Sequence, residues 1–196
     1  MARTVEFNRD EVLHNAMNTF WHKGYSMTSI PNLVSATKLN PGSLYAAFDS
    51  KEGLFLETLA LYGQRSLATL QQFIIEADSP LKGIENFFHT LVNKPNDESQ
   101  KGCLLVNTIL EMSSHNSCIQ AQANKQLQAV ETELFEALKQ AQNQGELAIE
   151  KNPKSLAKYL MVNIWGIRVM AKSGSLKNDT NAKNAVLNEI LKNLNT

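Results

Sequence analysis

Apolar residues recur every three or four positions along much of the chain, which is the spacing of helices that bury one face. In the first such segment, 9–23, the residues on the apolar side are Val12, Leu13, Ala16, Met17, Phe20 and Trp21. Asn8 precedes this segment as a capping residue with Glu11 three positions later, and Gly24 follows it as a stop. No alternation of apolar and polar residues is long enough to predict a strand. The pattern therefore predicts an all-α fold.

Eight further helices follow from the same periodicity and from residues that begin or end helices. Thr28 is the predicted cap of the second helix, whose first turn tolerates Pro31 because the N–H that proline lacks is not needed there. Asn40 with Pro41 begins a short third helix, and Ser50 caps a long fourth one. The predicted helices cover residues 9–23, 28–37, 41–48, 51–76, 80–93, 103–114, 117–143, 153–172 and 180–194, and the polar segment NKPNDESQKG at 93–102 is predicted to be a flexible loop.

The composition is that of a folded globular protein. The 196 residues are 43% hydrophobic and 19% charged, and this length suits one domain or a small domain fused to a larger one. The formal net charge is zero, but residues 1–51 hold five basic and four acidic residues, 52–150 hold six and thirteen, and 151–196 hold eight and two. Charge alone therefore does not indicate a nucleic-acid-binding protein.

The two cysteines, Cys103 and Cys118, are too few for a disulfide framework. The sequence also has no basic-apolar leader and no apolar run of about 18 residues. We therefore expect a cytoplasmic protein with no membrane partner. The four histidines have no paired spacing with either cysteine that suits zinc or copper, so neither a metal site nor a cofactor is predicted.

The second and third predicted helices have the size and spacing of a helix-turn-helix, because only residues 38–40 separate them. In such a unit the second helix enters the major groove of DNA and the first lies across the backbone. Leu33, Leu39, Leu44 and Phe48 fall at helical spacing and are predicted to form the core of this unit rather than to contact DNA.

This region closely resembles the N-terminal domain of the TetR/AcrR transcriptional regulators. The resemblance covers FWHKGYSMTSIPNLVSATKLNPGSLYAAFDSKEGLFLETLALY, residues 20–62, in which the family pattern is carried by Phe20, Gly24, Tyr25, Thr28, Ser29, Ile30, Leu33, Ala36, Leu39, Gly42, Ser43, Leu44, Tyr45, Phe48, Ser50, Lys51 and Glu52. A second segment, KGCLLVNTILEM at 101–112, is similar to part of the regulatory domain in one TetR branch.

The resemblance implies a homodimeric DNA-binding protein, usually a repressor, that binds a pseudo-palindromic operator in double-stranded DNA. Its helical body is expected to bind a small-molecule or electrophile effector and so change the separation of the two DNA-binding heads. The implied domains are a helix-turn-helix domain at 1–50 and a helical regulatory and dimerisation domain at 51–196.

The docking geometry of a helix-turn-helix gives individual residues their expected roles. Tyr45 and Ser43 are expected to face the DNA, and Gly42 to let the backbone approach it closely. Thr28, Ser29 and Lys51 stand at helix starts, where free N–H groups help bind phosphate. The predicted DNA-binding residues are Thr28, Ser29, Asn40, Pro41, Gly42, Ser43, Tyr45 and Lys51.

Two features concern the ends of this unit. Lys38 stands where many relatives have glycine, so the turn is expected to hold a non-glycine residue at positive φ, at a cost of about 1 kcal/mol. Arg3 and Arg9 either form an arm that reaches the duplex or belong to a disordered tail.

The body contains aromatic, methionine and histidine side chains that could line an apolar cavity: Phe87, Phe88, His89, Met112, His115, Met161, Trp165 and Met170. Cys103, Phe88, Met161 and Trp165 are the predicted ligand-binding residues, and the alternative for each is an ordinary core position. Cys103 follows Lys101 and Gly102 at a helix start, a setting that favours a reactive thiolate, although a buried unreactive thiol is the other interpretation.

The last two helices are predicted to form a four-helix bundle across a two-fold axis. The residues assigned to this interface are Leu156, Leu160, Ile164, Ile167, Met170, Ala185, Val186, Ile190 and Leu194.

Two other functions compete with ligand-controlled regulation: a helical adaptor that has lost DNA binding, and an all-α enzyme or carrier with a degenerate head. For the enzyme, the sequence offers only Glu111 and His115, four residues apart on one helix, as an acid–base pair. We therefore expect no enzymatic activity.

Overall fold

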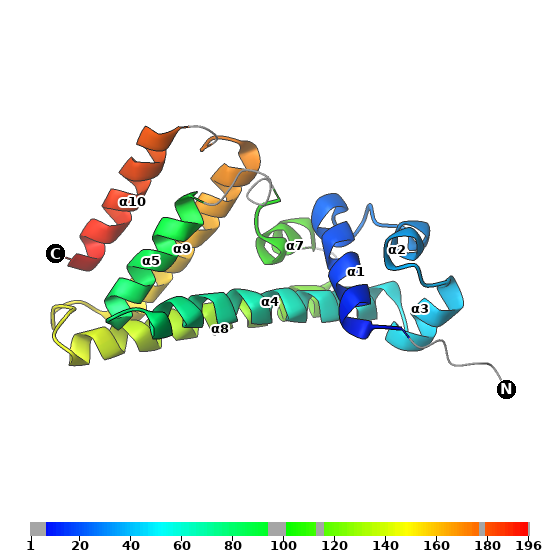
Figure 1. The fold of residues 1–196 in the computed structure, drawn as a ribbon, viewed down its shortest axis with the longest axis horizontal. Helices are drawn as coiled ribbons and strands as arrows, with labels where there is room; N and C mark the ends of the chain where they lie inside the picture. The colour runs from blue at the N-terminus through cyan, green and yellow to red at the C-terminus, as the bar shows by residue number, and fades with distance from the viewer. Residues whose placement is uncertain (1–6, 94–100, 113–115, 177–178, 196) are drawn as a thin grey trace. The chain divides into compact units, whose positions relative to one another are not determined.

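The computed structural model describes residues 7–93, 101–112, 116–176 and 179–195, and no strand occurs within these ranges. The helices in these ranges, labelled in Figure 1, are α1 (Arg9–Lys23), α2 (Ile30–Thr37), α3 (Pro41–Phe48), α4 (Lys51–Glu76), α5 (Pro80–Asn93), α7 (Leu104–Met112), α8 (Ser117–Asn143), α9 (Pro153–Ser173) and α10 (Thr180–Asn195). The all-α prediction is confirmed, and most predicted boundaries agree with the structure to within one or two residues. The predicted flexible loop falls mainly on residues 94–100, which lie outside the described ranges.

Capping side chains begin the helices largely as the sequence predicts. The Asn8 side chain accepts hydrogen bonds from the backbone N–H groups of Asp10 and Glu11, at 3.0 and 3.2 Å. Gly24 ends α1 with a φ of 79°, which a residue with a Cβ rarely adopts. The Ser50 hydroxyl accepts from the N–H of Gly53 at 2.9 Å and so caps α4.

The predicted cap of α2 was wrong by one residue. Ser29 is the cap: its hydroxyl accepts from the N–H of Asn32, and the Asn32 side chain accepts from the N–H of Ser29. Thr28 is buried, and its hydroxyl donates to the carbonyl of Gly24 at 2.6 Å. Thr28 therefore closes the turn between α1 and α2. Ser29 caps α2 instead, because Ser29 and Asn32 form a reciprocal pair of hydrogen bonds.

The turn between α2 and α3 has the strained backbone that the sequence predicts. Lys38 adopts the left-handed conformation with a φ of 61° and donates its N–H to the carbonyl of Val34. Leu39, directly after it, is buried, as are the other predicted core residues Leu33, Leu44 and Phe48. Burial of these four side chains holds the turn in a conformation that costs about 1 kcal/mol for a non-glycine residue.

The chain forms two compact units, each described by itself. Unit 1 comprises residues 1–64 and 104–126, and unit 2 comprises residues 65–103 and 127–196. The predicted domain boundary between residues 50 and 51 stays a prediction. In unit 1, Phe20 packs against Phe55 and Tyr25, with ring centroids 4.6 and 6.2 Å away.

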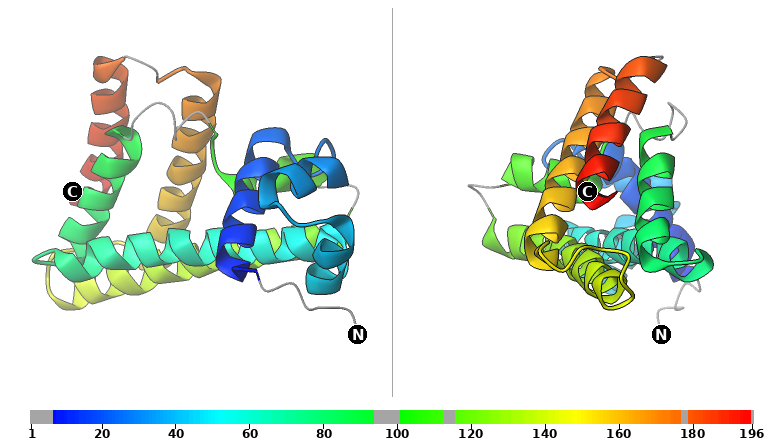
Figure 2. Two further views of the ribbon diagram at one scale, coloured as in Figure 1. Left: turned by 45° about the vertical axis from the view of Figure 1, so that its right-hand side comes forward. Right: turned by 90° about the vertical axis from the view of Figure 1, so that its left-hand side faces the viewer.

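In unit 2, α5 packs against both α9 and α10, and the three helices lie side by side in Figures 1 and 2. Gly83 on α5 allows a close approach to the end of α4, because a Cβ at this position would lie 2.5 Å from the Cα of Ile74. The interior of unit 2 includes the fully buried side chains of Leu70, Ile84, Phe88, Leu134 and Leu160. Among the described residues, no helix is both long and apolar enough to span a membrane.

Candidate nucleic-acid interface

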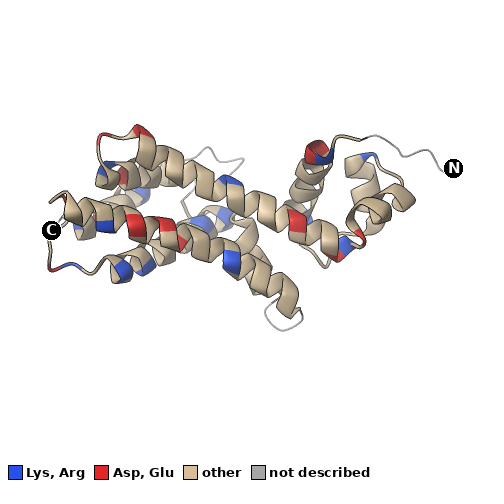
Figure 3. Cartoon of the chain, turned by 90° about the horizontal axis from the view of Figure 1, so that it is seen from below, with Lys and Arg blue, Asp and Glu red and all other residues tan. Residues whose placement is uncertain are grey.

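Helix α3 has one exposed and one buried face, and the exposed face carries no charge. Leu44 and Phe48 point into the core of unit 1, whereas Pro41, Gly42, Tyr45 and Ala46 are exposed, Tyr45 to 44%. Ser43 is half-buried. No Lys, Arg, Asp or Glu occurs in α2 or α3, in contrast to the charged residues of the longer helices in Figure 3. The face can therefore offer hydroxyl groups, methyl groups and closely approaching backbone, but no salt bridges.

The start of α3 is fixed by its own cap. The Asn40 side-chain oxygen accepts from the N–H of Ser43 at 2.9 Å, and Pro41 occupies the first helical position, where its missing N–H costs nothing. Asn40 is also exposed, so its side chain both caps the helix and stands beside the exposed face.

The end of α3 is held by Arg9, which the sequence analysis assigned to a DNA-reaching arm or a disordered tail. Both alternatives were wrong for Arg9: it begins α1, and its guanidinium donates to the carbonyl of Ala47 at 3.2 Å and to both carboxylate oxygens of Glu57 at 2.6 and 2.8 Å. The guanidinium also lies 4.4 Å from the ring centroid of Phe48. Arg9 therefore ties α3 to α1 and α4. Arg3 lies outside the described residues.

The other predicted contact residues lie at the starts of α2 and α4. Ser29 is exposed at the start of α2. Lys51 is half-buried at the start of α4, with its ammonium 4.3 Å from the ring centroid of Tyr25. Burial lowers the pKa of Lys51, and the negative charge of Glu111 partly offsets this effect. Thr28 differs from both because its hydroxyl is already engaged inside the turn.

The exposed residues of unit 1 that were not predicted as contacts include Ala46, Lys38 and Met27. Ala46 lies one helical turn after Gly42, so the spacing of the exposed face could have identified it. Lys38 is exposed in the turn between α2 and α3, and Met27 is 77% exposed just before α2. No sequence signal marked Met27, because it lies in the turn before α2, where there is no helical periodicity to identify an exposed face.

Two family descriptions match separate parts of this chain. Residues 12–58 match "Bacterial regulatory proteins, tetR family", and residues 80–188 match "Tetracyclin repressor-like, C-terminal domain". The first match includes α2, α3 and the exposed face described above. The chain belongs to the TetR family.

Named relatives and solved structures agree with this assignment. The chain is 31% identical over 176 residues to the HTH-type transcriptional repressor ComR of Escherichia coli K12, covering 89% of this chain and 84% of ComR. It is 30% identical over 174 residues to the uncharacterized HTH-type regulator YezE of Bacillus subtilis 168, covering 88% and 90%. The TetR-family regulator CifR, solved as a cysteine mutant with a 26-bp operator duplex, is 28% identical with a TM-score of 0.84, over 95% and 96% of the two chains.

The TetR-family chain is therefore a helix-turn-helix transcriptional regulator.

Its predicted ligand-binding residues lie in different environments. Phe88 is fully buried and Met161 is 4% exposed, whereas Trp165 is 37% exposed on α9. Cys103 is a half-buried free cysteine directly before α7.

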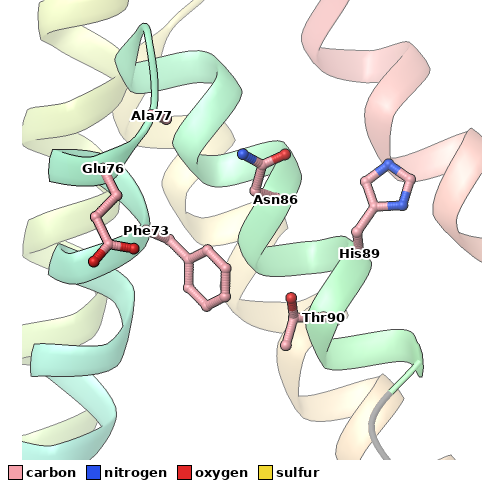
Figure 4. A pocket seen from close by; sticks show the side chains of 6 residues that line it. All are labelled: Phe73, Glu76, Ala77, Asn86, His89 and Thr90. Carbon is pink, nitrogen blue, oxygen red and sulfur yellow. The ribbon is translucent and has the colours of Figure 1, made fainter.

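A groove in unit 2 of this TetR-family chain brings together residues that the sequence analysis did not group. It has a volume of about 390 Å³ and is lined by Phe73, Glu76, Ala77, Asn86, His89 and Thr90. Figure 4 shows these side chains at the end of α4, at Ala77 directly after it, and on α5, with the Phe73 ring between the two helices. Of the six, only His89 was in the predicted cavity-lining set. Asn86, His89 and Thr90 share one helix face by their spacing, which was the available signal.

The predicted dimer face of α9 and α10 was partly wrong. Leu160, Ile167, Ile190 and Leu194 are buried within the protomer, between 0% and 2% exposed, and cannot form an interface between copies. The exposed large apolar residues of α9 are instead Val162, Trp165, Val169 and Met170, at 68%, 37%, 49% and 37%. Of this exposed set, only Met170 was among the residues predicted for the interface. His115, of the predicted acid–base pair, lies outside the described residues.

Proposed function

We propose that this regulator represses transcription by binding a pseudo-palindromic operator as a homodimer, and that a small-molecule or electrophile effector releases it. The observation that carries the proposal is the exposed, uncharged face of α3, held between the Asn40 cap and the Arg9 clamp. A helix exposed in this way fits the major groove. The names of ComR, a repressor, and CifR, solved with operator DNA, support the same function.

The DNA contacts follow from exposure and chemistry. The Tyr45 hydroxyl would contact a phosphate or a base edge, and Ser43 a neighbouring base. Pro41 and Ala46 offer apolar surface to thymine methyl groups, and Gly42 offers close approach of the backbone.

Phosphate contacts would come from the helix starts, from Ser29, Asn40 and Lys51, with Lys38 added because it is exposed in the turn. Thr28 is proposed to act indirectly, by holding Ser29 in place, because its own hydroxyl is engaged by Gly24.

The dimer would form through the exposed apolar stripe on α9. Val162, Trp165 and Val169 stand at positions i, i+3 and i+7 and therefore share one helix face. Contiguous exposed apolar surface of this kind is typical of an interface, and a two-fold axis lets the same stripe pack on itself. Trp165 is then an interface residue. The residues proposed for effector binding are therefore Phe88, Met161 and Cys103.

We infer that the effector binds in the interior of unit 2, next to Phe88 and Met161, or reacts with the Cys103 thiol. No catalytic role is proposed, since the named relatives are regulators. Acting on operator DNA, the protein would work in the cytoplasm.

Selection of duplexes from a random-sequence library by the purified protein tests this function. The wild type should enrich a two-fold-symmetric sequence. Replacing Tyr45 with Phe should weaken binding to this sequence by roughly 5- to 30-fold, because the variant loses one hydrogen bond to the DNA. Treatment with N-ethylmaleimide should release the duplex from the wild type and from Cys118→Ser, but not from Cys103→Ser. Failure to enrich any duplex would refute the regulator; release of the Cys103→Ser variant would refute the thiol as effector site.

A further inference from the structure

The Glu111 carboxylate on α7 binds the turn that precedes the helix-turn-helix. Its Oε2 accepts from the N–H of Tyr25 at 3.0 Å, and its Oε1 accepts from the N–H of Ser26 at 2.7 Å. The two donors are successive backbone amides, so the carboxylate is held at both oxygens. Glu111 and the two amides belong to unit 1, although 86 positions separate Glu111 from Tyr25.

The backbone of Gly24 is shaped around this carboxylate. A Cβ at Gly24 would lie 2.7 Å from Glu111 Oε2, and Gly24 has a φ of 79° with a ψ of 168°, a combination accessible almost only to glycine. The same turn is closed from the other side by the Thr28 hydroxyl, which donates to the Gly24 carbonyl at 2.6 Å. The position of Ser29, the α2 cap, therefore depends on a turn that Glu111 holds.

Lys51 is linked to Glu111 through Tyr25. The Tyr25 ring packs against Phe55 at 4.9 Å between centroids and carries the Lys51 ammonium 4.3 Å from its own centroid. Burial raises the pKa of Glu111, but the hydrogen bonds from Ser26 and Tyr25 and the Lys51 charge outweigh burial, and the pKa is lowered overall. Glu111 is therefore an anion in this place, and the Lys51 ammonium lies within its field.

We propose that Glu111 is a positioning residue for DNA binding: by fixing the Tyr25–Ser26 backbone it sets the Tyr25 ring, and through that ring the Lys51 ammonium, for contact with phosphate. This proposal rests on the proposed function. Glu111 does not itself touch DNA in this arrangement. It acts through the turn before α2 and through the start of α4.

The test is a double-mutant cycle on DNA affinity, with the duplex that wild-type protein selects from a random library as the probe. Dissociation constants would be measured by fluorescence anisotropy over a series of KCl concentrations for Glu111→Ala, Glu111→Gln, Lys51→Ala and Glu111→Ala with Lys51→Ala. We expect Glu111→Ala to weaken binding by roughly 3- to 30-fold and Glu111→Gln by less, since glutamine keeps one acceptor.

The salt dependence separates positioning from general structure. If Glu111 positions Lys51, then Glu111→Ala lowers the slope of log Kd against log salt by about as much as Lys51→Ala does, and the double variant loses little beyond Lys51→Ala. Glu11→Gln, which removes an exposed carboxylate from α1, is the matched control and should bind as tightly as wild type or more tightly.

Each outcome decides something. Unchanged or tighter binding by folded Glu111→Ala, or full additivity with Lys51→Ala, overturns the positioning role. If Glu111→Ala does not fold, the same criteria apply to Glu111→Gln, with circular dichroism and melting temperature as the check on folding. A wild type that selects no duplex removes the proposed function itself, which is a distinguishable result.

Discussion

The Arg9 clamp gives the most direct test of how unit 1 holds α3. Replacing Arg9 with Met keeps much of the apolar stem but removes the guanidinium that contacts Ala47, Glu57 and Phe48. The side chains of Arg9 and Glu57 are 47% and 40% exposed, so solvent screens the ion pair and it is worth at most about 1 kcal/mol. The Ala47 carbonyl bond and the Phe48 cation–π contact add about 0.5–1 kcal/mol each.

The free energy of unfolding should therefore fall by about 1–2.5 kcal/mol for Arg9→Met, because these contributions overlap and do not add fully. In a chain of this size each kcal/mol lowers the melting temperature by about 2–4 °C. Urea unfolding monitored by circular dichroism measures the change. A cycle with Glu57→Gln should give a coupling energy of roughly 0.5–1 kcal/mol that shrinks in high salt.

Two control variants separate the geometry of the Arg9 clamp from its charge. Arg9→Lys keeps the charge but loses the planar fork that reaches Glu57 and Ala47 together, so it should recover less than half of the lost stability. Lys139→Met removes an exposed cation whose ammonium lies 4.0 Å from Glu136, and it should change stability by less than about 0.5 kcal/mol. Equal stability of Arg9→Lys and wild type would show that charge alone, rather than the clamp geometry, matters at this position.

Three further predictions concern the turn at Gly24 and the exposed stripe of α9. Gly24→Ala should cost about 2–4 kcal/mol and Gly145→Ala only about 1 kcal/mol, since both have positive φ but only Gly24 faces Glu111; equal losses in urea unfolding would contradict this. Because the hydrogen bonds from Ser26 and Tyr25, helped by the Lys51 charge, outweigh burial and lower the folded-state pKa of Glu111 below 4.5, its contribution to stability is present above pH 4.5 and is lost as the pH falls through the folded-state pKa. Acid unfolding of Glu111→Gln should lack this component, and an identical pH profile for both proteins would disprove it. Val162→Asp should lower the mass found by light scattering from dimer to monomer, with exposed Lys154→Asp as the control; a dimeric Val162→Asp would exclude the stripe.

Local chemistry made much of the fold predictable from the sequence. Asn8, Asn40 and Ser50 cap helices as expected because a capping side chain bonds to amides two or three residues later. The positive φ of Lys38 was predictable from the family resemblance, because Lys38 stands where many relatives have glycine. Thr28 and Ser29 are both good caps, and only the reciprocal bond between Ser29 and Asn32 decides between them.

Contacts between distant parts of the chain were not predictable. The Arg9–Glu57 pair spans 48 positions and the Glu111–Tyr25 bond spans 86, and no periodicity connects either pair. The face of α9 posed a different difficulty, because apolar residues occur around most of its circumference. Periodicity cannot tell which side a helix buries within its own chain, so Leu160 and Ile167 were assigned to the interface while Val162 and Val169 were not.

The lack of charge on α3 explains why positioning at the edges of the head matters. An uncharged α3 can discriminate bases through Ser43, Tyr45 and methyl contacts, but it cannot neutralise phosphates. In the proposed dimer, Lys38 and Lys51 of each head would supply about four phosphate contacts. The logarithm of the association constant would then fall against the logarithm of the salt concentration with a slope of only about −4. With so few cations, the loss of one per head removes about half of the electrostatic contribution. A residue that fixes Lys51 can therefore control operator affinity without touching DNA, which is the role that the geometry of Glu111 suits.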